Sequence, residues 1–444
     1  MLERFLGATE HLFWLYSQCY PLDFATVAKL QGQFNLDQLA VALRQVQQRH
    51  PLLRVRIVID ALSAERNSEG TGQPKFVETD DEIPIRLVAR THDQQWQQEL
   101  EVELARSFDW QVAPLLRVVL LQSGSESELM IVYHHAIADG LSSVYLLQDI
   151  LQALEGKTFE RLDLSTSPSL ESAFPGTAPS PEATTKPTAY RTISRGSIPH
   201  IRSVVLSTEL TQQLIQRSRA EGTTVHGAIS AAFLFALMQQ DVRPNHVIPC
   251  LHAVNVRSHL SLPMPDGVGL YICLCTTTHS LQEDSAFWDV ARSVKAQLSQ
   301  IDIAQQLVEE RQLRQPTMTT LTDPTAFVKE LQSQYPTQLS ITNLGRIKIA
   351  QQPGKIQIKA LHAPIPMSGV DQGRVVGVAT LDDPSELGGA NRIALTLVAA
   401  PLMDVNRTES NRAATAFLSE GVKRLERAVI KEVSLEDAGT KRCC

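Results

Sequence analysis

Two adjacent histidines, followed by an aspartate and a glycine, are the residues of this chain best suited to chemistry. The segment reads Tyr133-His134-His135-Ala136-Ile137-Ala138-Asp139-Gly140. A neutral imidazole, with an ordinary pKa of about 6.5, can take a proton from an alcohol or amine in a transition state, and such general-base catalysis is worth about 10²- to 10⁴-fold in rate. Adjacent residues that leave a strand point to opposite faces, so we expect one ring to face a cleft and the other to be structural.

Other interpretations of the same residues stay open on spacing alone. A His-His pair is more often one packed core histidine beside one surface histidine, and Asp139 could fix the loop or bind a cation. A metal site would use His134, His135 and Asp139. We expect no metal, because neighbouring strand residues diverge and no further Cys or His cluster completes a tetrahedral ligand set. A further histidine, His226, lies in an apolar helical segment. It is expected to be buried and bonded to a backbone carbonyl rather than to act as a second base.

Hydrophobic periodicity places the histidine segment between a strand and a helix. A short apolar run precedes it, and apolar residues at helical spacing follow Gly140, which permits a tight entry to that helix. In the first part of the chain, Asn35 is expected to cap a helix that ends at His50-Pro51. Strands are expected over Leu52–Ile59, Leu115–Leu121 and Leu129–Tyr133. In the second part, the pattern predicts helices over Thr224–Gln239, Phe287–Ser299 and Asn411–Val429, and strands over Val247–Val256 and Gly269–Thr278.

A segment rich in Pro, Ser and Thr divides the chain. It runs from 164 to 200, and its density of helix and strand breakers predicts a linker or crossover. We therefore expect an N-terminal domain over residues 1–163 that carries the histidines, and a C-terminal domain over residues 201–444. Because strands and helices alternate in both parts, the predicted fold class is α/β, in α+β layers with two sheets and at least one shared face.

Composition excludes several classes of protein. The chain has 444 residues, 41 Lys and Arg and 48 Asp and Glu, for a net charge of −7. A nucleic-acid binder would need a basic face, so no nucleic-acid partner is expected. The opening residues are interrupted by charge before a signal core can form, and no apolar stretch is long enough for a transmembrane segment, so we expect a cytoplasmic protein. Six cysteines are too few and too irregular for a disulfide framework, and Cys273 and Cys275 should face the same side of a strand.

The histidine segment resembles the HHxxxDG signature of the condensation-domain superfamily, the CoA-dependent and carrier-protein-dependent acyltransferases related in fold to chloramphenicol acetyltransferase. The resemblance continues in order along the chain, and it is closest to the stand-alone alcohol acyltransferases of the polyketide-associated type. The segments that carry it are Glu10–Leu15, Leu36–Leu43, Arg49–Arg54, Phe108–Arg117, Val254–Arg257 with Gly267–Gly269, and Ser340–Arg346. The resemblance implies two chloramphenicol-acetyltransferase-like domains around a central tunnel.

The resemblance also implies a role for each site residue. The second histidine, His135, would act on the acceptor nucleophile inside the tunnel, and His134 would be packed. Asp139 would form an ion pair with Arg257 of the other domain, which locks the loop. The Gly140 N–H would approach the thioester carbonyl. Asn343 could donate to the developing oxyanion, although a turn asparagine beside Gly345 is at least an equal interpretation.

These expectations together predict an acyltransferase that forms esters and, less readily, amides, without a covalent acyl-enzyme. The donor would be an acyl thioester on CoA or on a phosphopantetheinyl acyl carrier protein, with no bound cofactor. The acceptor would be an alcohol or amine, and a monomer would suffice. Two alternatives stay open: a catalytically silent scaffold that recruits a carrier protein, and an epimerase acting on a carrier-bound aminoacyl group. The final Cys443-Cys444 resembles a prenylated tail. The alternative interpretation is a plain frayed end of the chain.

Overall fold

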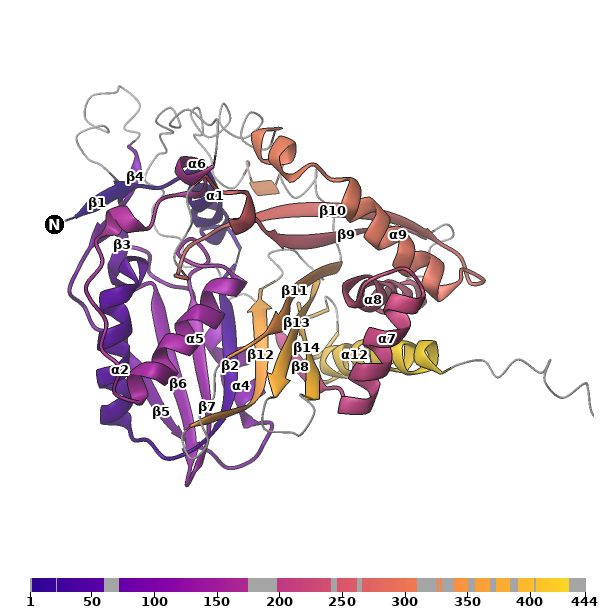
Figure 1. The fold of residues 1–444 in the computed structure, drawn as a ribbon, viewed down its shortest axis with the longest axis horizontal. Coiled ribbons are helices and arrows are strands. Elements are labelled where there is room, and N and C mark those ends of the chain that lie inside the picture. Colours follow the sequence, from indigo (N-terminus) through magenta and orange to yellow (C-terminus); the bar gives the residue numbers. More distant parts are fainter. Residues whose placement is uncertain are drawn as a thin grey trace, which may run out of the picture.

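Two large mixed β-sheets and one small antiparallel sheet form the frame of the molecule, with helices packed on them (Figure 1). The computed structural model describes residues 2–20, 22–59, 72–174, 198–240, 246–261, 266–309, 326, 328–329, 339–349, 356–367, 373–383, 390–402 and 405–430. The predicted α/β class is confirmed, whereas the described residues form three sheets where the pattern predicted two.

The N-terminal half is built on a five-stranded sheet in the order β12-β2-β7-β6-β5. Its strands are β2 (Phe24–Gln31), β5 (Ile85–Ala89), β6 (Leu116–Ser123), β7 (Glu126–Tyr133) and β12 (Gln357–Pro366). Helices α2 (Leu36–Arg49) and α5 (Gly140–Leu154) pack on one face, and α4 (Gln95–Leu104) packs on the other. Strand β12 comes from the second half of the chain and pairs antiparallel with β2, so the two halves share a sheet.

The C-terminal half is built on a six-stranded sheet in the order β10-β9-β11-β13-β14-β8. Its strands are β8 (His200–Val205), β9 (His246–Asn255), β10 (Ile272–Leu281), β11 (Leu339–Ile347), β13 (Arg374–Asp383) and β14 (Ala390–Ala399). One apolar core joins this sheet to α7 (Thr208–Ala220), α8 (Val225–Gln240), α9 (Phe287–Gln300) and α12 (Arg407–Val429). Helix α8 is apolar around its circumference because it lies among the other helices and the sheet.

The small sheet, in the order β1-β4-β3, lies beside the N-terminal helix α1 (Ala8–Ser17). Its strands are β1 (Glu3–Phe5), β3 (Val55–Ile59) and β4 (Pro74–Glu78). The short helix α6 (Leu170–Ala173) holds the start of α1, because the Glu171 carboxylate accepts hydrogen bonds from the Thr9 backbone N–H at 2.8 Å and hydroxyl at 2.7 Å. Thus residues inside the first part of the predicted linker fix the position of α1.

The predicted elements are present with several shifted boundaries. The capped helix is confirmed: α2 starts after Asn35, whose side chain accepts the Gln38 N–H at 2.8 Å. The strand predicted over Leu52–Ile59 is wrong in its first half, because Pro51–Arg54 is a 3-10 helix and β3 starts at Val55. Proline has a fixed φ suited to a helical first turn, and the Arg54 side chain is buried in an ion pair with Glu78.

Two other boundaries shift for identifiable reasons. Strand β10 starts at Ile272 rather than Gly269, because the backbone groups of Gly269 and Tyr271 bond to residues of the histidine loop instead. Helix α12 starts at Arg407 rather than Asn411, because the Asn406 side chain accepts the Glu409 N–H at 3.0 Å and caps it. The local sequence pattern does not reveal the hydrogen bonds of Gly269 and Tyr271 to the distant histidine loop. It also does not show which of the two asparagines, Asn406 or Asn411, marks the start of α12.

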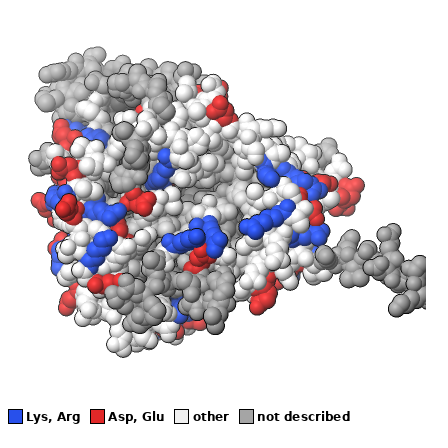
Figure 2. Space-filling view, in the orientation of Figure 1, with Lys and Arg blue, Asp and Glu red and all other residues white. Residues whose placement is uncertain are grey.

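Positively and negatively charged side chains lie close together on the surface. On the face drawn in Figure 2, Lys and Arg side chains lie next to Asp and Glu side chains. Arg292, for example, contacts Glu221 at 2.8 Å and also pairs with Asp289. Arg424 pairs with Glu420 at 2.8 Å. Within the part of the chain that is described, no helix is long and apolar enough to cross a bilayer.

The structure describes four of the six cysteines: Cys19, Cys250, Cys273 and Cys275. Both Cys273 and Cys275 are buried, which confirms that they face the same side of β10. The division into domains at 164–200 stays a prediction, and residues 175–197 of that segment lie outside the described residues, as do Cys443 and Cys444.

Candidate active site

The histidine loop joins β7 to α5, the helix that Asp139 caps. The Asp139 side chain accepts the Ser142 N–H at 2.9 Å, so the aspartate ends the loop and begins the helix at Gly140. Helix α5 then packs its apolar residues against α2 and the N-terminal sheet. The loop is therefore fixed at both ends by rigid elements, which is what a precisely placed side chain requires.

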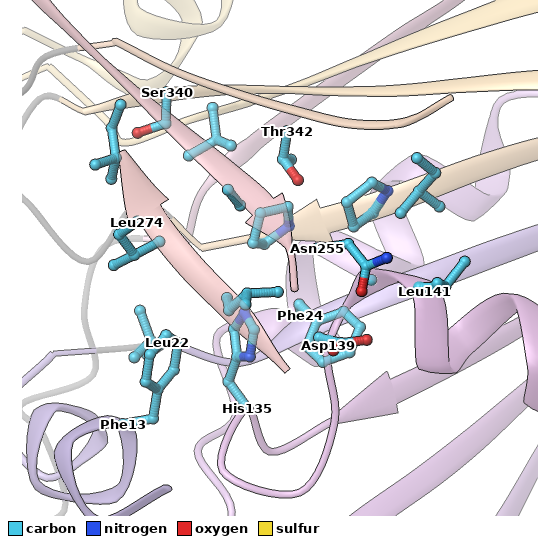
Figure 3. A pocket seen from close by; sticks show the side chains of 18 of the residues that line it. Phe13, Leu22, Phe24, His135, Asp139, Leu141, Asn255, Leu274, Ser340 and Thr342 are labelled. Carbon is cyan, nitrogen blue, oxygen red and sulfur yellow. The ribbon is translucent and has the colours of Figure 1, made fainter. Parts of the chain in front are cut away.

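A pocket of about 250 Å³ lies between the two halves and contains the loop residues His135, Asp139 and Gly140. The N-terminal half contributes Leu12 and Phe13 of α1, with Leu22 and Phe24. The C-terminal half contributes side chains of β9, β10, β11 and β13, and the shared strand β12 contributes prolines. Figure 3 shows the ring of His135 reaching into this pocket. Its walls are predominantly apolar, so a polar group inside it is largely shielded from water.

The two nitrogens of His135 have different environments. Nδ1 lies 2.9 Å from the carbonyl oxygen of Ala138. A carbonyl can only accept, so Nδ1 carries the proton and Nε2 keeps its lone pair. The rings of Phe13 and Phe24 lie with their centroids 4.7 and 4.6 Å from the imidazole and hold it in place. Burial lowers the pKa of His135 to about 4, so the ring is neutral at physiological pH.

The neighbouring His134 lies on the other side of the loop and is packed. Its Nδ1 accepts the Ala136 N–H at 3.2 Å, and its Nε2 lies 3.0 Å from Ser17 Oγ. Because the Ser17 hydroxyl donates to the Trp14 carbonyl at 2.7 Å, Nε2 must be the donor to Ser17. Burial lowers the pKa of His134 to about 3. Both nitrogens are thus occupied by hydrogen bonds, and the ring ties the loop to α1.

Asp139 and Arg257 form a bidentate ion pair between the two halves of the chain. Arg257 Nη1 lies 2.8 Å from Oδ2, and Nη2 lies 3.1 Å from Oδ1. Asp139 is completely buried. Burial by itself would raise the pKa of Asp139, but the guanidinium and the N–H groups of Ser142 and Tyr271 hold it below its ordinary value. The carboxylate therefore stays charged and acts as a fixed acceptor rather than as a proton donor.

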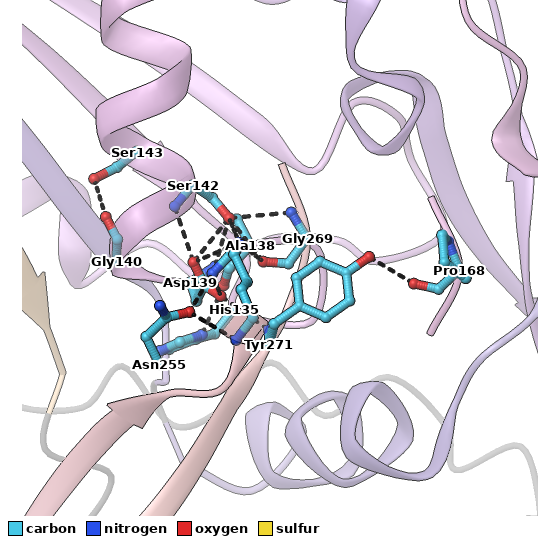
Figure 4. Close-up of polar contacts among 11 residues, drawn as sticks. His135, Ala138, Asp139, Gly140, Ser142, Ser143, Pro168, Asn255, Gly269 and Tyr271 are labelled. Atoms are coloured by element: carbon cyan, nitrogen blue, oxygen red, sulfur yellow. Dashed lines mark hydrogen bonds and ion pairs between the residues drawn. The ribbon is translucent and has the colours of Figure 1, made fainter. Parts of the chain in front are cut away.

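Ser142 and Tyr271, which the sequence reasoning missed, complete this network together with Gly269, as Figure 4 shows. The buried Ser142 hydroxyl lies 2.9 Å from Asp139 Oδ1, 2.7 Å from the Gly269 carbonyl and 3.1 Å from Arg257 Nη2. The Tyr271 N–H donates to Asp139 Oδ2 at 2.9 Å. Gly269 also accepts the Asp139 N–H at 3.1 Å. Ser142 stands three residues after the capping aspartate, a spacing that could have marked it as a capping partner.

Gly140 and Asn343 both line the pocket. A Cβ added at Gly140 would come within 2.9 Å of Leu344 Cδ2 and 3.1 Å of Pro364 Cγ, so the glycine lets α5 begin against the opposite wall. Its N–H is the first of the helix and has no partner within the helix itself. Asn343 Oδ1 accepts the Gly345 N–H at 2.8 Å, and Gly345 has a φ of +69°. Asn343 thus makes the local bond that the turn interpretation expects through its oxygen, and a role of its amide nitrogen toward an oxyanion stays a prediction.

The prediction for His226 is wrong in its hydrogen-bond partner. Its ring is packed in the interior as expected, but its partner is another histidine rather than a backbone carbonyl, with Nε2 2.9 Å from His252 Nδ1. His252 Nε2 lies 2.9 Å from Thr277 Oγ1, which also lies 2.8 Å from His279 Nε2. This chain of polar groups lies behind β9, whose alternate residues face the pocket. Periodicity could not find it, because its members come from α8, β9 and β10.

Two family models match the chain in succession. The condensation-domain model matches residues 20–166, and the model "Phthiocerol/phthiodiolone dimycocerosyl transferase C-terminus" matches residues 195–385. Tyrocidine synthase 3 of Brevibacillus parabrevis is 32% identical over 139 residues. That segment covers 31% of this chain and 2% of the synthase, so the chain spans only a small fraction of this curated relative.

Solved structures share the fold over nearly the whole chain. Polyketide synthase associated protein 5 from Mycobacterium tuberculosis matches 93% of this chain and 97% of its own, with a TM-score of 0.59 and 17% identity. The epimerization domain from the third module of tyrocidine synthetase B matches 97% of this chain and 98% of its own, with a TM-score of 0.59 and 14% identity. The two family matches together place the chain in the condensation-domain superfamily, with a C-terminal half that matches the dimycocerosyl transferase C-terminus model, and the solved structures share its fold.

Proposed function

We propose that the chain transfers an acyl group from a thioester, carried by CoA or by an acyl carrier protein, to the hydroxyl of an acceptor. An amine is the second choice of acceptor. The observation that supports this most is the free Nε2 of His135, which belongs to a neutral, oriented imidazole inside a pocket between the two halves. This nitrogen can accept the acceptor's proton as the oxygen attacks the thioester carbonyl.

The attack forms a tetrahedral oxyanion next to a newly protonated imidazole. The two opposite charges stabilise each other in an apolar pocket, which offsets the low basicity of the buried ring. The Gly140 N–H, at the positive end of α5, and the Asn343 amide are the candidate donors to the oxyanion. Collapse of the intermediate expels the thiolate, which takes the proton from His135, so no covalent acyl-enzyme is required.

Asp139 and Arg257 support this chemistry as positioning residues. Their ion pair closes the loop against the C-terminal half, so the Nε2 of His135 and the start of α5 keep a fixed relation to the opposite wall. Because both carboxylate oxygens of Asp139 accept hydrogen bonds from Arg257 and the pKa of this carboxyl is held below the ordinary value, the carboxylate does not exchange protons with a substrate.

Acyl transfer from a panel of acyl-CoA and acyl-carrier-protein donors to alcohols tests the proposal. His135→Gln, which keeps a polar side chain without a base, should lower kcat about 10²- to 10⁴-fold at unchanged melting temperature. His134→Gln serves as the matched control, and it should affect folding more than the pH dependence of the rate. Equal activity of wild type and His135→Gln would overturn the proposal.

Two further measurements separate the alternatives. Mass spectrometry of a single turnover should show no acyl group on the protein, and an acylated residue would rule out direct transfer. The shared fold with an epimerization domain cannot distinguish transfer from epimerisation. Deuterium exchange at the α-carbon of a carrier-bound aminoacyl group without transfer would select the epimerase. No turnover of any thioester by wild type would favour the silent scaffold.

A further inference from the structure

Tyr271 lies beside the ion pair that joins the two halves of the chain. The carbon of the Arg257 guanidinium lies over its ring, 4.8 Å from the ring centroid. Tyr271 is only 2% exposed, and it is not among the described residues that line the pocket, whereas Arg257 is. Any effect of Tyr271 on a substrate in the pocket must therefore pass through the residues that it contacts.

The backbone of Tyr271 bonds to both sides of this ion pair. Its N–H donates to Asp139 Oδ2 at 2.9 Å. Its carbonyl accepts the N–H of Val256, the residue before Arg257, at 3.0 Å. The side chain that starts from this backbone is therefore held in a fixed place next to the guanidinium, and not by its own packing alone.

The ring supplies a restraint that the hydrogen bonds of Arg257 do not. Both Nη atoms bond to Asp139, but among the described residues the buried Nε has no hydrogen-bond partner. The hydrogen bonds thus hold the end of the guanidinium, and the ring holds its carbon, nearer the stem of the side chain. A cation over an aromatic ring is also attracted to it, most strongly where water is excluded. Tyr145 of α5 places a second ring 5.7 Å from the same carbon.

The Tyr271 ring itself is supported at its edge and at its end. A Cβ added at Gly269 would lie 2.3 Å from Tyr271 Cε2, so the ring fills the space that a side chain there would need. At the far end, the hydroxyl donates to the Pro168 carbonyl at 2.7 Å, as Figure 4 shows. These contacts make the ring a rigid support for the guanidinium.

We infer that Tyr271 is a positioning residue for the transfer reaction, and that its ring acts by holding Arg257 in place against Asp139. The ion pair fixes the histidine loop, and a displacement of about 1 Å in a reacting group can lower a rate about 100-fold. This inference rests on the proposed function, because it concerns the rate of that reaction. It assigns the ring to the rate and the hydroxyl to stability, and the two can be removed separately.

Two substitutions separate the ring from the hydroxyl. Tyr271→Phe keeps the ring and removes the bond to Pro168, whereas Tyr271→Leu keeps an apolar side chain and removes both. Phe417→Leu is the matched control, because Phe417 is a fully buried ring of the same half that lies under another arginine, Arg374, at 5.0 Å. The values of kcat, and of KM for donor and acceptor, are measured well below the melting temperature of each variant.

Tyr271→Leu should lower kcat about 10-fold and leave both KM values within about twofold, because the ring lies outside the pocket. Tyr271→Phe should keep at least about half of the wild-type kcat and still melt at a lower temperature, because the Pro168 carbonyl loses its donor. Phe417→Leu should melt at a lower temperature with the wild-type kcat. A loss of kcat that follows the loss of melting temperature across the three variants would show a merely structural role and overturn the inference.

A double-mutant cycle tests whether the ring acts through Arg257. Arg257→Lys keeps the charge but loses the planar guanidinium and its two-pronged contact. Adding Tyr271→Leu to Arg257→Lys should lower kcat by less than about threefold, because the group that the ring holds is already gone. A loss as large as in the wild-type background would overturn the inference. Should Tyr271→Leu not fold, Tyr271→Met takes its place in both experiments, because a flexible side chain fills the same space.

If wild type transfers no acyl group, the proposed function fails, and the contact of the ring with Arg257 is still measurable. In NMR spectra of protein with isotope-labelled arginine, the Nε–H signal of Arg257 is identified by its absence in Arg257→Lys. The ring current of Tyr271 should shift this signal, so Tyr271→Leu should move it and Tyr271→Phe should leave it close to the wild-type position. An unmoved signal in Tyr271→Leu would overturn the inference.

Discussion

Asp139, at the start of α5, and Arg257, just after β9, form an ion pair with both Nη atoms of the arginine on the carboxylate, at 2.8 and 3.1 Å. The two residues lie 118 positions apart in the chain. Asn255 Oδ1 accepts from the same Nη1, and the rings of Tyr271 and Tyr145 lie 4.8 and 5.7 Å from the guanidinium carbon. This pair thus joins the histidine loop to the pocket wall of the other half.

Removing one member of that pair should destabilise the protein. Asp139→Asn keeps the shape but leaves the guanidinium without its counter-charge, and about 3 kcal/mol of unfolding free energy should be lost. Chemical denaturation measures it. The exposed pair Arg346–Asp382, at 2.8 Å, provides the matched control, and Asp382→Asn there should cost less than about 1 kcal/mol. Similar losses at the two sites would contradict the locking role of Asp139.

The rate should be insensitive to pH across the neutral range. Only the neutral ring of His135 can accept a proton, and burial lowers its pKa to about 4. With an alcohol acceptor, kcat/KM should therefore be level from about pH 8 to pH 5 and fall about tenfold per unit below pH 4. Samples returned to pH 7 must regain activity. An acid limb near the ordinary histidine value of about 6.5 would contradict this assignment of the base.

The histidine chain behind β9 should make stability depend on pH. Burial lowers the pKa of His226 and His279 to about 4 and that of His252 to about 2. The pKa values of these three histidines in the folded state lie below the unfolded value of about 6.5. The stabilising contribution of the neutral histidines is therefore complete above that pH. It is lost as pH falls, at up to about 1.4 kcal/mol per unit for each buried histidine.

Denaturation midpoints between pH 7 and pH 5 test this dependence. His279→Gln keeps an amide that can still reach Thr277 but removes the titrating ring. It should reduce the change of unfolding free energy with pH by about the contribution of one histidine. His259→Gln, at a position where the side chain is exposed, controls for the substitution itself. An unchanged slope in His279→Gln would show that this chain of groups does not govern acid stability.

Two glycines should respond differently to the same added methyl group. At Gly377 on β13, a Cβ would lie 1.8 Å from the carbonyl oxygen of Pro364 on β12, so Gly377→Ala must separate backbone from backbone and should prevent stable folding. At Gly140 the nearest atom is the end of the Leu344 side chain, which can move. Gly140→Ala should fold, narrow the pocket beside His135 and lower kcat/KM more than the melting temperature. Comparable melting temperatures for the two variants would refute the close approach of β12 and β13.

Much of this site was predictable from local pattern. The strand before His134, the helix after Gly140 and the cap at Asn35 depend on neighbouring residues, so periodicity and capping predict them. The resemblance of scattered motifs gave the pairing of Asp139 with Arg257 as an expectation. The spacing of Ser142 could have marked it as a capping partner of Asp139, but its bond to the Gly269 carbonyl and the bond of the Tyr271 N–H to Asp139 could not be predicted in this way. Their role depends on which backbone groups the folded chain leaves without a partner.

The sequence by itself determined the type of elements, the histidine signature and the neutral chemistry that an imidazole offers, because these follow from residue type and from contacts within a turn or a strand. Only the tertiary structure decided which histidine nitrogen is free and where β12 crosses into the N-terminal sheet. Those features depend on register and packing between segments far apart in the chain, and short-range pattern contains no information on either.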